Sequence, residues 1–326
     1  MSESPAIVAF GGGHGLAASL AALRRVTSRL TAIVTVADDG GSSGRLRQEL
    51  GALPPGDLRM ALVALAEREG KAALWAKAFQ HRFGGSGELA GHAMGNLILT
   101  ALATETGDPV RALDAAAELL GCRGRVLPLS PEPVDIVATV ATVAEVKGES
   151  GRTSSVRGQV AVATTTGRVE TLELVPSAPR ACPEALAAVA AADALVLGPG
   201  SLFTSVMPHL LSPAMAEAIF AASAKRVLVL NIAAQPGETT GFAPHTHLEE
   251  IARLVPALRL DAVIADPRVV PDLESLRLAS GALGAALILA PVAISGKPHH
   301  DPVTLAAAFQ RVMKEVKGRK AGDTPS

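Results

Sequence analysis

Short, continuously apolar segments alternate with amphipathic ones at the start of this chain. Residues 6–10 (AIVAF) are uninterrupted apolar positions, a pattern typical of a strand buried on both faces. After a glycine-rich segment, residues 16–26 carry leucines at helical spacing, and residues 30–36 (LTAIVTV) are rich in the β-branched residues that favour strands. The pattern predicts a strand–loop–helix–strand unit whose two strands are parallel and joined by a right-handed crossover.

The hydrophobic pattern changes twice in the middle of the chain. Helical spacing persists without an intervening strand through four segments: 57–69, 71–81, 91–104 and 108–120. We expect these segments to form a helical layer or insertion packed on the sheet. Short β-branched stretches between turn residues then predict strands at 134–140, 159–164 and 169–174, with a hairpin connection at 164–168. These strands are expected to form a small antiparallel accessory sheet.

Alternation between helix and strand returns in the last part of the chain. The pattern predicts a helix at 183–192, strands at 194–197, 226–230, 261–265 and 286–289, and a closing helix at 302–316. The predicted fold class is therefore α/β, with a Rossmann-like, mostly parallel sheet covered by helices on both faces. Neither a repeat nor a linker divides the sequence, so we expect one domain over 1–316 and a polar, disordered tail over 317–326.

Composition narrows the class of partner. The 30 Lys and Arg residues balance 31 Asp and Glu residues, and aromatic residues make up 2% of the chain, so neither a basic field nor a stacking platform for nucleic acid is expected. Charges or Gly/Pro clusters interrupt every apolar run that approaches membrane-spanning length, and the N-terminus lacks a secretory pattern. Cys122 and Cys182 lack metal-binding spacing and are expected to be reduced core residues. We therefore expect a cytoplasmic protein that binds neither nucleic acid nor membranes.

The candidate binding residues lie where an apolar strand ends and a glycine-rich loop begins. In open α/β sheets, ligands bind beyond the carboxyl ends of the strands, so we expect these loops to converge on one crevice. Glycine lets backbone N–H groups approach phosphate closely, and the following helix N-terminus adds unpaired donors. The first loop contributes Gly11, Gly12, Gly13, His14 and Gly15. His14 is expected to line the loop, with a role as general base as the alternative.

The second loop, 36–47 (VADDGGSSGRLR), has the more specific pattern. Asp38 and Asp39 follow the second predicted strand, where a dinucleotide fold places the carboxylate that binds ribose. Alternatively, either carboxylate holds a divalent cation such as Mg²⁺ beside phosphate oxygens, and no other cofactor is expected. The hydrogen-bond donors of this loop are Gly40, Gly41, Ser42, Ser43 and Arg45. A capped turn before a surface helix is the purely structural interpretation.

Later motifs complete the predicted site. Asp57 is either a helix cap or a site residue, and Arg59 is expected to face the same crevice. His92 and Asn96 are spaced as on one face of a helix, and His92 is equally consistent with a core position. The remaining candidates of this group are Gly198, Gly200, Ser201, Thr204, Gln235, Glu238 and Thr239. These later loops contain no GxSxG elbow, Walker A lysine or paired Ser–His spacing, which argues against a hydrolase or a P-loop kinase.

Together, these motifs resemble those of the gluconeogenesis-factor family, the YvcK type of the CofD-like superfamily. The segments, in order, are GGGHGL (11–16), VADDGGSSGRLR (36–47), PPGDLR (54–59), GHAMGN (91–96), GPGSLFTS (198–205) and NIAAQPGET (231–239). The resemblance implies a Rossmann-like fold and a cytoplasmic regulator that binds UDP-sugars such as UDP-N-acetylglucosamine. It also implies a link to gluconeogenic growth, cell shape and peptidoglycan precursor supply. A protein partner and a homo-oligomeric state are further expectations.

The enzyme branch of the same superfamily supplies the alternative function. That branch is 2-phospho-L-lactate transferase, which moves a phospholactyl group onto a deazaflavin, so the resemblance implies a transferase of this type as the alternative. The DDGGSSGR and PPGDLR segments follow the regulator-type pattern, so the regulator is preferred and no catalytic residue is assigned. An NAD(P)-dependent dehydrogenase rests on the first strand–loop–helix unit alone and is the least favoured hypothesis.

Four positions depart from the family pattern. His14 stands where Thr or Ser is usual, and Met60 stands where Asn is common. Phe242 replaces a Tyr and His299 replaces an Arg, at two positions that the family associates with the nucleotide-sugar, so both belong to the predicted site. Loss of a phenolic hydroxyl and a guanidinium removes a hydrogen bond and a charge pair from a bound diphosphate, which predicts weaker binding of UDP-sugars.

Overall fold

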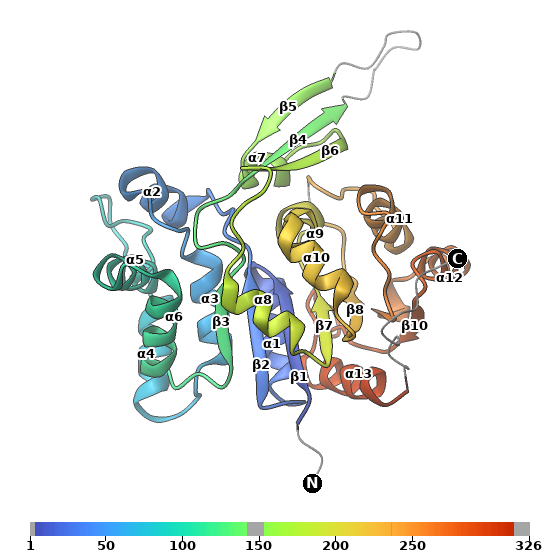
Figure 1. Ribbon diagram of the computed structural model, residues 1–326, viewed down its shortest axis with the longest axis horizontal. Helices are drawn as coiled ribbons and strands as arrows, with labels where there is room; N and C mark the ends of the chain where they lie inside the picture. The colour runs from blue at the N-terminus through green and yellow to red at the C-terminus, as the bar shows by residue number, and fades with distance from the viewer. Residues whose placement is uncertain (1–3, 142–152, 236, 316–326) are drawn as a thin grey trace.

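One parallel sheet of seven strands forms the centre of the molecule (Figure 1). The computed structural model describes residues 4–141, 153–235 and 237–315. The strand order is β10-β9-β8-β7-β1-β2-β3. The strands are β1 (Ala6–Gly11), β2 (Arg29–Val34), β3 (Arg125–Pro128), β7 (Ala194–Leu197), β8 (Lys225–Val229), β9 (Ala262–Ala265) and β10 (Ala286–Leu289). The predicted Rossmann-like, mostly parallel sheet is confirmed.

The sheet reverses its direction of growth at β1. From β1 the chain passes through α1 (Gly13–Leu23) to β2 on one side, whereas β7 lies on the other side and leads outward to β8, β9 and β10. Residues 7–10 of β1 pair with 194–197 of β7, and residues 6–11 pair with 29–34 of β2. Such a reversal opens a crevice beyond the carboxyl ends of β1 and β7, where open α/β sheets bind ligands.

Helices cover both faces of the sheet, as predicted. Right-handed crossovers that leave β1 and β7 in opposite directions place their helices on opposite faces. On one face α1 packs against α3 (Gly56–Leu65) and α13 (Pro302–Glu315), and on the other α8 (Pro183–Ala190) packs against α10 (Pro213–Ala221), in front of the sheet in Figure 1. The second half also contains α9 (Met207–Leu211), α11 (Pro244–Leu254), α12 (Leu273–Ala282) and short turns η1 (Leu202–Val206) and η2 (Pro267–Val269).

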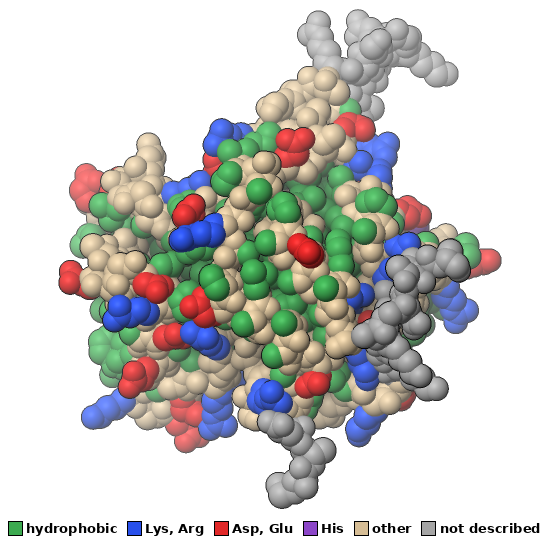
Figure 2. All heavy atoms as spheres, in the orientation of Figure 1, with side chains coloured by type: hydrophobic (Ala, Val, Ile, Leu, Met, Phe, Trp, Pro, Cys, Tyr) green, Lys and Arg blue, Asp and Glu red, His purple; other side chains and the backbone are tan. Residues whose placement is uncertain are grey.

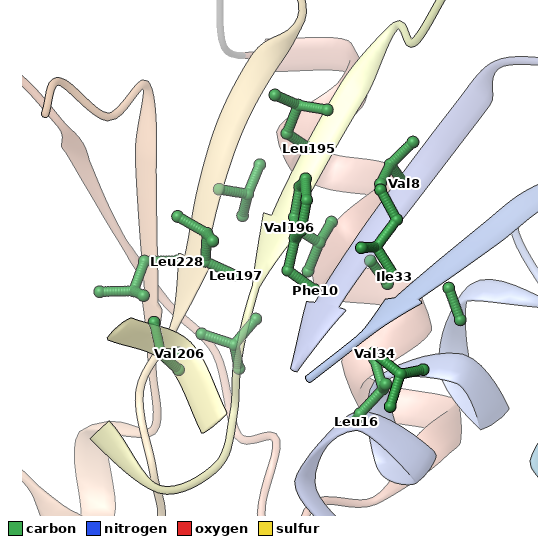
Figure 3. Close-up of a cluster of buried hydrophobic side chains, with 14 of the residues drawn as sticks. Val8, Phe10, Leu16, Ile33, Val34, Leu195, Val196, Leu197, Val206 and Leu228 are labelled. Atoms are coloured by element: carbon green, nitrogen blue, oxygen red, sulfur yellow. The ribbon is translucent and has the colours of Figure 1, made fainter. Parts of the chain in front are cut away.

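The hydrophobic core lies between the central strands and these helices. Every residue of β7 and β9 is buried, and so is every residue of β1 except the first. Figure 3 shows side chains of β1, β2, β7 and β8 in one apolar cluster, together with Leu16 of α1. Because apolar burial stabilises a fold by about 25 cal/mol per Å², this cluster fixes the strand ends from which the glycine-rich loops emerge.

The run of helices predicted after residue 57 forms most of the connection between β2 and β3. Its helices are α3, α4 (Gly70–Gln80), α5 (Met94–Thr106) and α6 (Pro109–Leu119), and one further helix, α2 (Gly41–Leu50), precedes the run. Of these, α3 packs on β2 and β3, whereas α4 and α5 pack against each other. The pattern did not predict β3, because four residues that include a proline give too short a signal for a strand.

A second, antiparallel sheet confirms the predicted accessory sheet and corrects one of its strands. Its order is β5 (Thr153–Arg157), β4 (Asp135–Ala141), β6 (Arg168–Val175). Residues 159–164 are not a strand: Gln159–Ala163 form helix α7, so 164–168 joins a helix to a strand and is not a hairpin. Gly158 turns the chain out of β5 with φ +103°, and the Asp39 carboxylate accepts a hydrogen bond from the Val160 N–H at 2.9 Å. This distant cap outweighs the β propensity of the segment.

The polar tail predicted for 317–326 lies outside the described residues. Within the described ranges, no helix combines the length and the hydropathy needed to cross a bilayer. On the face that Figure 2 shows, the described Lys and Arg side chains are interspersed with Asp and Glu, and apolar side chains occupy the centre. This face therefore presents no field of a single sign.

Candidate functional site

The loops that follow β1 and β7 touch each other where the sheet changes direction. A Cβ at Gly15 would overlap the Pro199 carbonyl oxygen and lie 2.7 Å from Gly200 Cα. Ser19 Oγ donates a hydrogen bond to the Gly198 carbonyl oxygen at 2.8 Å. Glycine at position 15 is therefore required for the two loops to approach this closely.

A cleft of about 730 Å³ opens at this junction. Small-molecule sites have volumes of roughly 300–1,000 Å³, so the cleft is large enough for a metabolite. Asn231, which follows β8, fixes one wall, because its side chain accepts a hydrogen bond from the Gly200 N–H and donates one to the Gly200 carbonyl oxygen, both at 2.8 Å. Predicted site residues that line the cleft are His14, Gly15, Gly200, Gln235 and His299.

Among the described lining residues of this cleft, every ionisable side chain is basic: His14, Lys297, His299 and His300. Burial lowers the pKa of His300 to about 4, so its imidazole is neutral, and its Nε2 lies 3.1 Å from the Leu230 carbonyl oxygen. Helix α1 starts beside the cleft without a side-chain cap at Gly12, and of the N–H groups in its first turn the one of Gly13 donates to Asp57. Basic side chains and a helix N-terminus together favour an anionic ligand.

A second pocket, of about 260 Å³, holds eight of the other candidates. Its lining includes Asp38, Gly40, Gly41, Ser42, Ser43, Asp57, Arg59 and Asn96. Arg82, which the motifs did not indicate, also lines it. Five predicted site residues therefore line the cleft and eight line the second pocket, whereas the loops were expected to converge on one crevice.

Asp57 lies between the second pocket and the first glycine-rich loop. A Cβ at Gly12 would overlap its Oδ2, an oxygen that is buried without a hydrogen-bond partner among the described residues. Burial raises the pKa of Asp57 to about 7, and the neighbouring Asp38 carboxylate adds to the rise. The carboxyl group of Asp57 is therefore protonated in a large fraction of molecules at neutral pH.

Asp38 and Asp57 are the carboxylates that line the second pocket. Asp38 accepts a hydrogen bond from the Gly40 N–H at 3.0 Å, whereas Asp39, the other candidate, is turned toward α7. Within the described ranges, no group of three or more His, Cys, Asp and Glu side chains is arranged to hold a metal. A Mg²⁺ ion at Asp38 and Asp57 would therefore take most of its ligands from phosphate oxygens and water.

Replacement of Asp39 with Ala is expected to loosen α7 by about 1 kcal/mol, the usual contribution of a helix cap, and to speed amide exchange there about fivefold. Hydrogen exchange read by mass spectrometry measures this effect. Asp108→Ala is the matched control: it removes the cap that accepts from the Val110 N–H at 2.8 Å and should speed exchange in α6 alone. Unchanged exchange of α7 in Asp39→Ala would show that the accessory sheet holds this helix without the cap.

A buried polar chain of four residues runs along the second pocket. Arg59 Nε donates to Asn96 Oδ1 at 2.8 Å, Asn96 Nδ2 donates to Ser42 Oγ at 2.9 Å, and Ser42 Oγ lies 3.0 Å from His92 Nδ1. The predicted common helical face of His92 and Asn96 is wrong, because Gly91 at φ +78° precedes His92 and α5 begins after it. Ser42 brings the two side chains together instead.

The turn after β7 is filled by a carboxylate of the protein itself. Glu238 is buried and accepts hydrogen bonds from Ser201 Oγ at 2.5 and 2.6 Å and from the Phe203 N–H at 2.5 Å. Burial raises the pKa of Glu238 against the effect of these bonds. Thr204 contacts Ser201, and Thr239 Oγ1 accepts from the Gln235 N–H at 2.9 Å. These side chains hold the shape of the loops beside the cleft.

Phe242 and His299, two site positions that differ from the family pattern, line two neighbouring pockets. His299 lines the cleft, and Phe242 lines a pocket of about 100 Å³ that shares residues 231–234 with it. The Phe242 ring packs edge-on against His247 at a centroid distance of 5.4 Å. Lys297 also lines the cleft, although the motifs did not indicate it. It could have been found in the sequence as a basic residue in the loop that follows β10, two residues before His299.

These features define a Rossmann-like α/β protein with a basic, glycine-lined cleft at the switch point of its sheet. The family model described as 2-phospho-L-lactate transferase CofD matches residues 7–280. A relative from Mycobacterium tuberculosis is 51% identical over 309 residues, which cover 94% of this chain and 90% of the relative. The gluconeogenesis factor of Bacillus subtilis is 38% identical over 272 residues, which cover 83% of this chain and 82% of that protein.

A solved structure is also similar to this chain over nearly its whole length. The crystal structure of a UPF0052 family member from Bacillus halodurans is 34% identical and has a TM-score of 0.84, covering 95% of this chain and 99% of that chain. The chain therefore belongs to the CofD family, and within it to the gluconeogenesis factors.

Proposed function

We propose that this chain is a regulator that binds a UDP-sugar, such as UDP-N-acetylglucosamine, in the cleft between the first loop and the loop after β7. The observation that carries the proposal is the cleft itself, which combines His14, Lys297 and His299 with the N-terminal end of α1. The gluconeogenesis factors among its relatives support a link to gluconeogenic growth. Roles in cell shape and in peptidoglycan precursor supply belong to the same proposal.

In the proposed complex, backbone N–H groups at the start of α1 bind the diphosphate. Lys297 and His299 balance its charge, because both residues line the same cleft. Residues 231–234 connect the cleft to the pocket of Phe242, which offers an apolar surface to the remainder of the ligand. Calorimetric titration with UDP-N-acetylglucosamine, with and without Mg²⁺, tests the proposal. No heat with any UDP-sugar at millimolar concentration would exclude this class of ligand.

Replacement of His299 with Arg is expected to strengthen UDP-N-acetylglucosamine binding about tenfold. A guanidinium carries a permanent charge and binds phosphate through two parallel hydrogen bonds, a gain of about 1.4 kcal/mol. His81→Arg is the matched control, because it makes the same change at an exposed position at the end of α4, outside the cleft. Equal gains in both variants would assign the effect to net charge and not to His299.

A transferase of phosphorylated groups is the second candidate. It is favoured by the description of the matching family model and by the second pocket, which lies beside the same first loop as the cleft. In this arrangement, a donor in the cleft and an acceptor in the second pocket would meet at Gly12 and Gly13. Incubation with a deazaflavin and an activated phospholactate tests it, since a transferase yields the coupled product and a binding protein does not.

A further inference from the structure

The polar chain beside the second pocket has a fixed direction. A guanidinium only donates hydrogen bonds, so the bond from Arg59 Nε orients the Asn96 amide with its oxygen toward Arg59 and its NH₂ group toward Ser42. Ser42 Oγ accepts from Asn96 and has its own hydrogen left for His92 Nδ1, 3.0 Å away. When Ser42 donates this hydrogen, His92 accepts it at Nδ1 and carries its own hydrogen on Nε2, which is the tautomer we assign to the pair. This is the arrangement of a serine with an adjacent base.

The surroundings of Ser42 suit a group that develops negative charge. Ser42 lies in the first turn of α2, whose N-cap, Gly40, makes no side-chain hydrogen bond, so the residue stands at the positive end of the helix dipole. Arg59, also a lining residue of the pocket, is 3% exposed, and its Nε donates to Asn96 Oδ1 at 2.8 Å, one residue away from Ser42 along the polar chain. A buried cationic side chain therefore accompanies the helix N-terminus.

From this geometry we infer that Ser42 is a nucleophile toward an activated phosphoryl group bound in the 260 Å³ pocket, with His92 as its base. Ser42 Oγ forms a bond to phosphorus while the bond from phosphorus to the leaving group breaks, and the leaving group departs with that electron pair. The serine proton passes to His92 Nδ1, and the imidazolium releases the Nε2 proton to water. The first-turn N–H groups and Arg59 hold the oxygen on which charge develops.

The charged groups around His92 and around the pocket decide which phosphorylating reagent is suitable for a test. Burial and the neighbouring Arg45 lower the pKa of His92, whereas Glu49 acts in the opposite direction. Asp38 and Asp57 also line the pocket and repel an anionic phosphoryl donor whenever they are ionised. A small, uncharged phosphorylating agent, diisopropyl fluorophosphate, avoids this repulsion.

The experiment incubates the full chain with diisopropyl fluorophosphate and locates the adduct by peptide mass spectrometry. We expect the adduct on Ser42, no adduct at that peptide in Ser42→Ala, and a rate about 100-fold lower in His92→Gln, the usual effect of losing a general base. The rate should fall on acidification with a midpoint below that of free imidazole. Ser280→Ala is the control, because Ser280 is buried in α12 and donates only to the Leu276 carbonyl oxygen at 2.7 Å.

Two outcomes would overturn the inference. One is the absence of a Ser42 adduct while a serine hydrolase in the same solution is labelled. The other is labelling of Ser42 at the same rate in His92→Gln, which would make the Ser42–His92 hydrogen bond a structural link between α2 and the segment before α5. Melting curves by circular dichroism accompany each variant, so a variant that fails to fold is recognised, and His92→Asn then replaces His92→Gln.

Discussion

Gly15→Ala is expected to lower the free energy of unfolding by about 3 kcal/mol and to remove the proposed UDP-sugar binding. The added methyl group would overlap the Pro199 carbonyl oxygen and lie 2.7 Å from Gly200 Cα. Both neighbours are backbone atoms at the end of a buried strand, so neither moves aside as a side chain does. Either the loop after β7 shifts, which opens the cleft, or the start of α1 shifts, which displaces its N–H groups.

Urea denaturation and calorimetric titration measure the two effects of Gly15→Ala. Gly281→Ala is the matched control, because Gly281 lies in α12 and a Cβ there meets no atom within 4 Å. A helical glycine exchanged for alanine in open space is expected to stabilise the protein by about 0.5–1 kcal/mol. If Gly15→Ala behaves like Gly281→Ala, the two loops separate easily and the cleft does not depend on their contact.

Asp57→Asn is expected to be more stable than the parent protein above pH 7, by up to about 4 kcal/mol, and to lose this advantage near pH 4. Burial and the Asp38 carboxylate raise the pKa of Asp57 from 3.8 to about 7. Between these values the folded protein holds a proton that the unfolded chain has lost, so the free energy of unfolding falls as pH rises. Asparagine has no proton to lose, and its oxygen replaces the acceptor for the Gly13 N–H.

Urea denaturation at several pH values between 4 and 8 measures the effect of Asp57→Asn. Glu105→Gln, at an exposed position on α5, controls for the loss of one negative charge. The difference between Asp57→Asn and the parent protein should grow through this range and level off above pH 7. Parallel curves for the two proteins would show that Asp57 is not desolvated in solution and that water or a cation reaches its Oδ2.

The sequence predicts the central sheet well because its strands are buried on both faces and interrupted by glycine-rich loops. Residues 6–10 and 194–197 illustrate this, since each is an apolar run that ends at a glycine. The segment 159–164 was predicted wrongly because its helix depends on Asp39, a cap more than a hundred residues away. Periodicity within a window cannot include such a partner.

The motifs did not predict that the candidate residues would line two separate pockets. The motifs indicated that the loops lie at the same edge of the sheet, which the structure bears out for the loops after β1 and β7. They did not indicate that Asp57 would stand against Gly12, or that Glu238 would fill the turn at Ser201. Both outcomes depend on side-chain packing between segments that are distant in the sequence.

The wide separation in sequence of the residues that line the cleft has a consequence for biosynthesis. Its walls come from residues 14–15, 199–200, 231–235 and 297–300. At roughly 5–20 residues per second, a ribosome needs about 15 to 60 seconds to pass from the first of these segments to the last. A nascent chain therefore exposes the start of α1 long before a complete cleft exists, and a ligand of the cleft can stabilise only chains whose synthesis has passed residue 300.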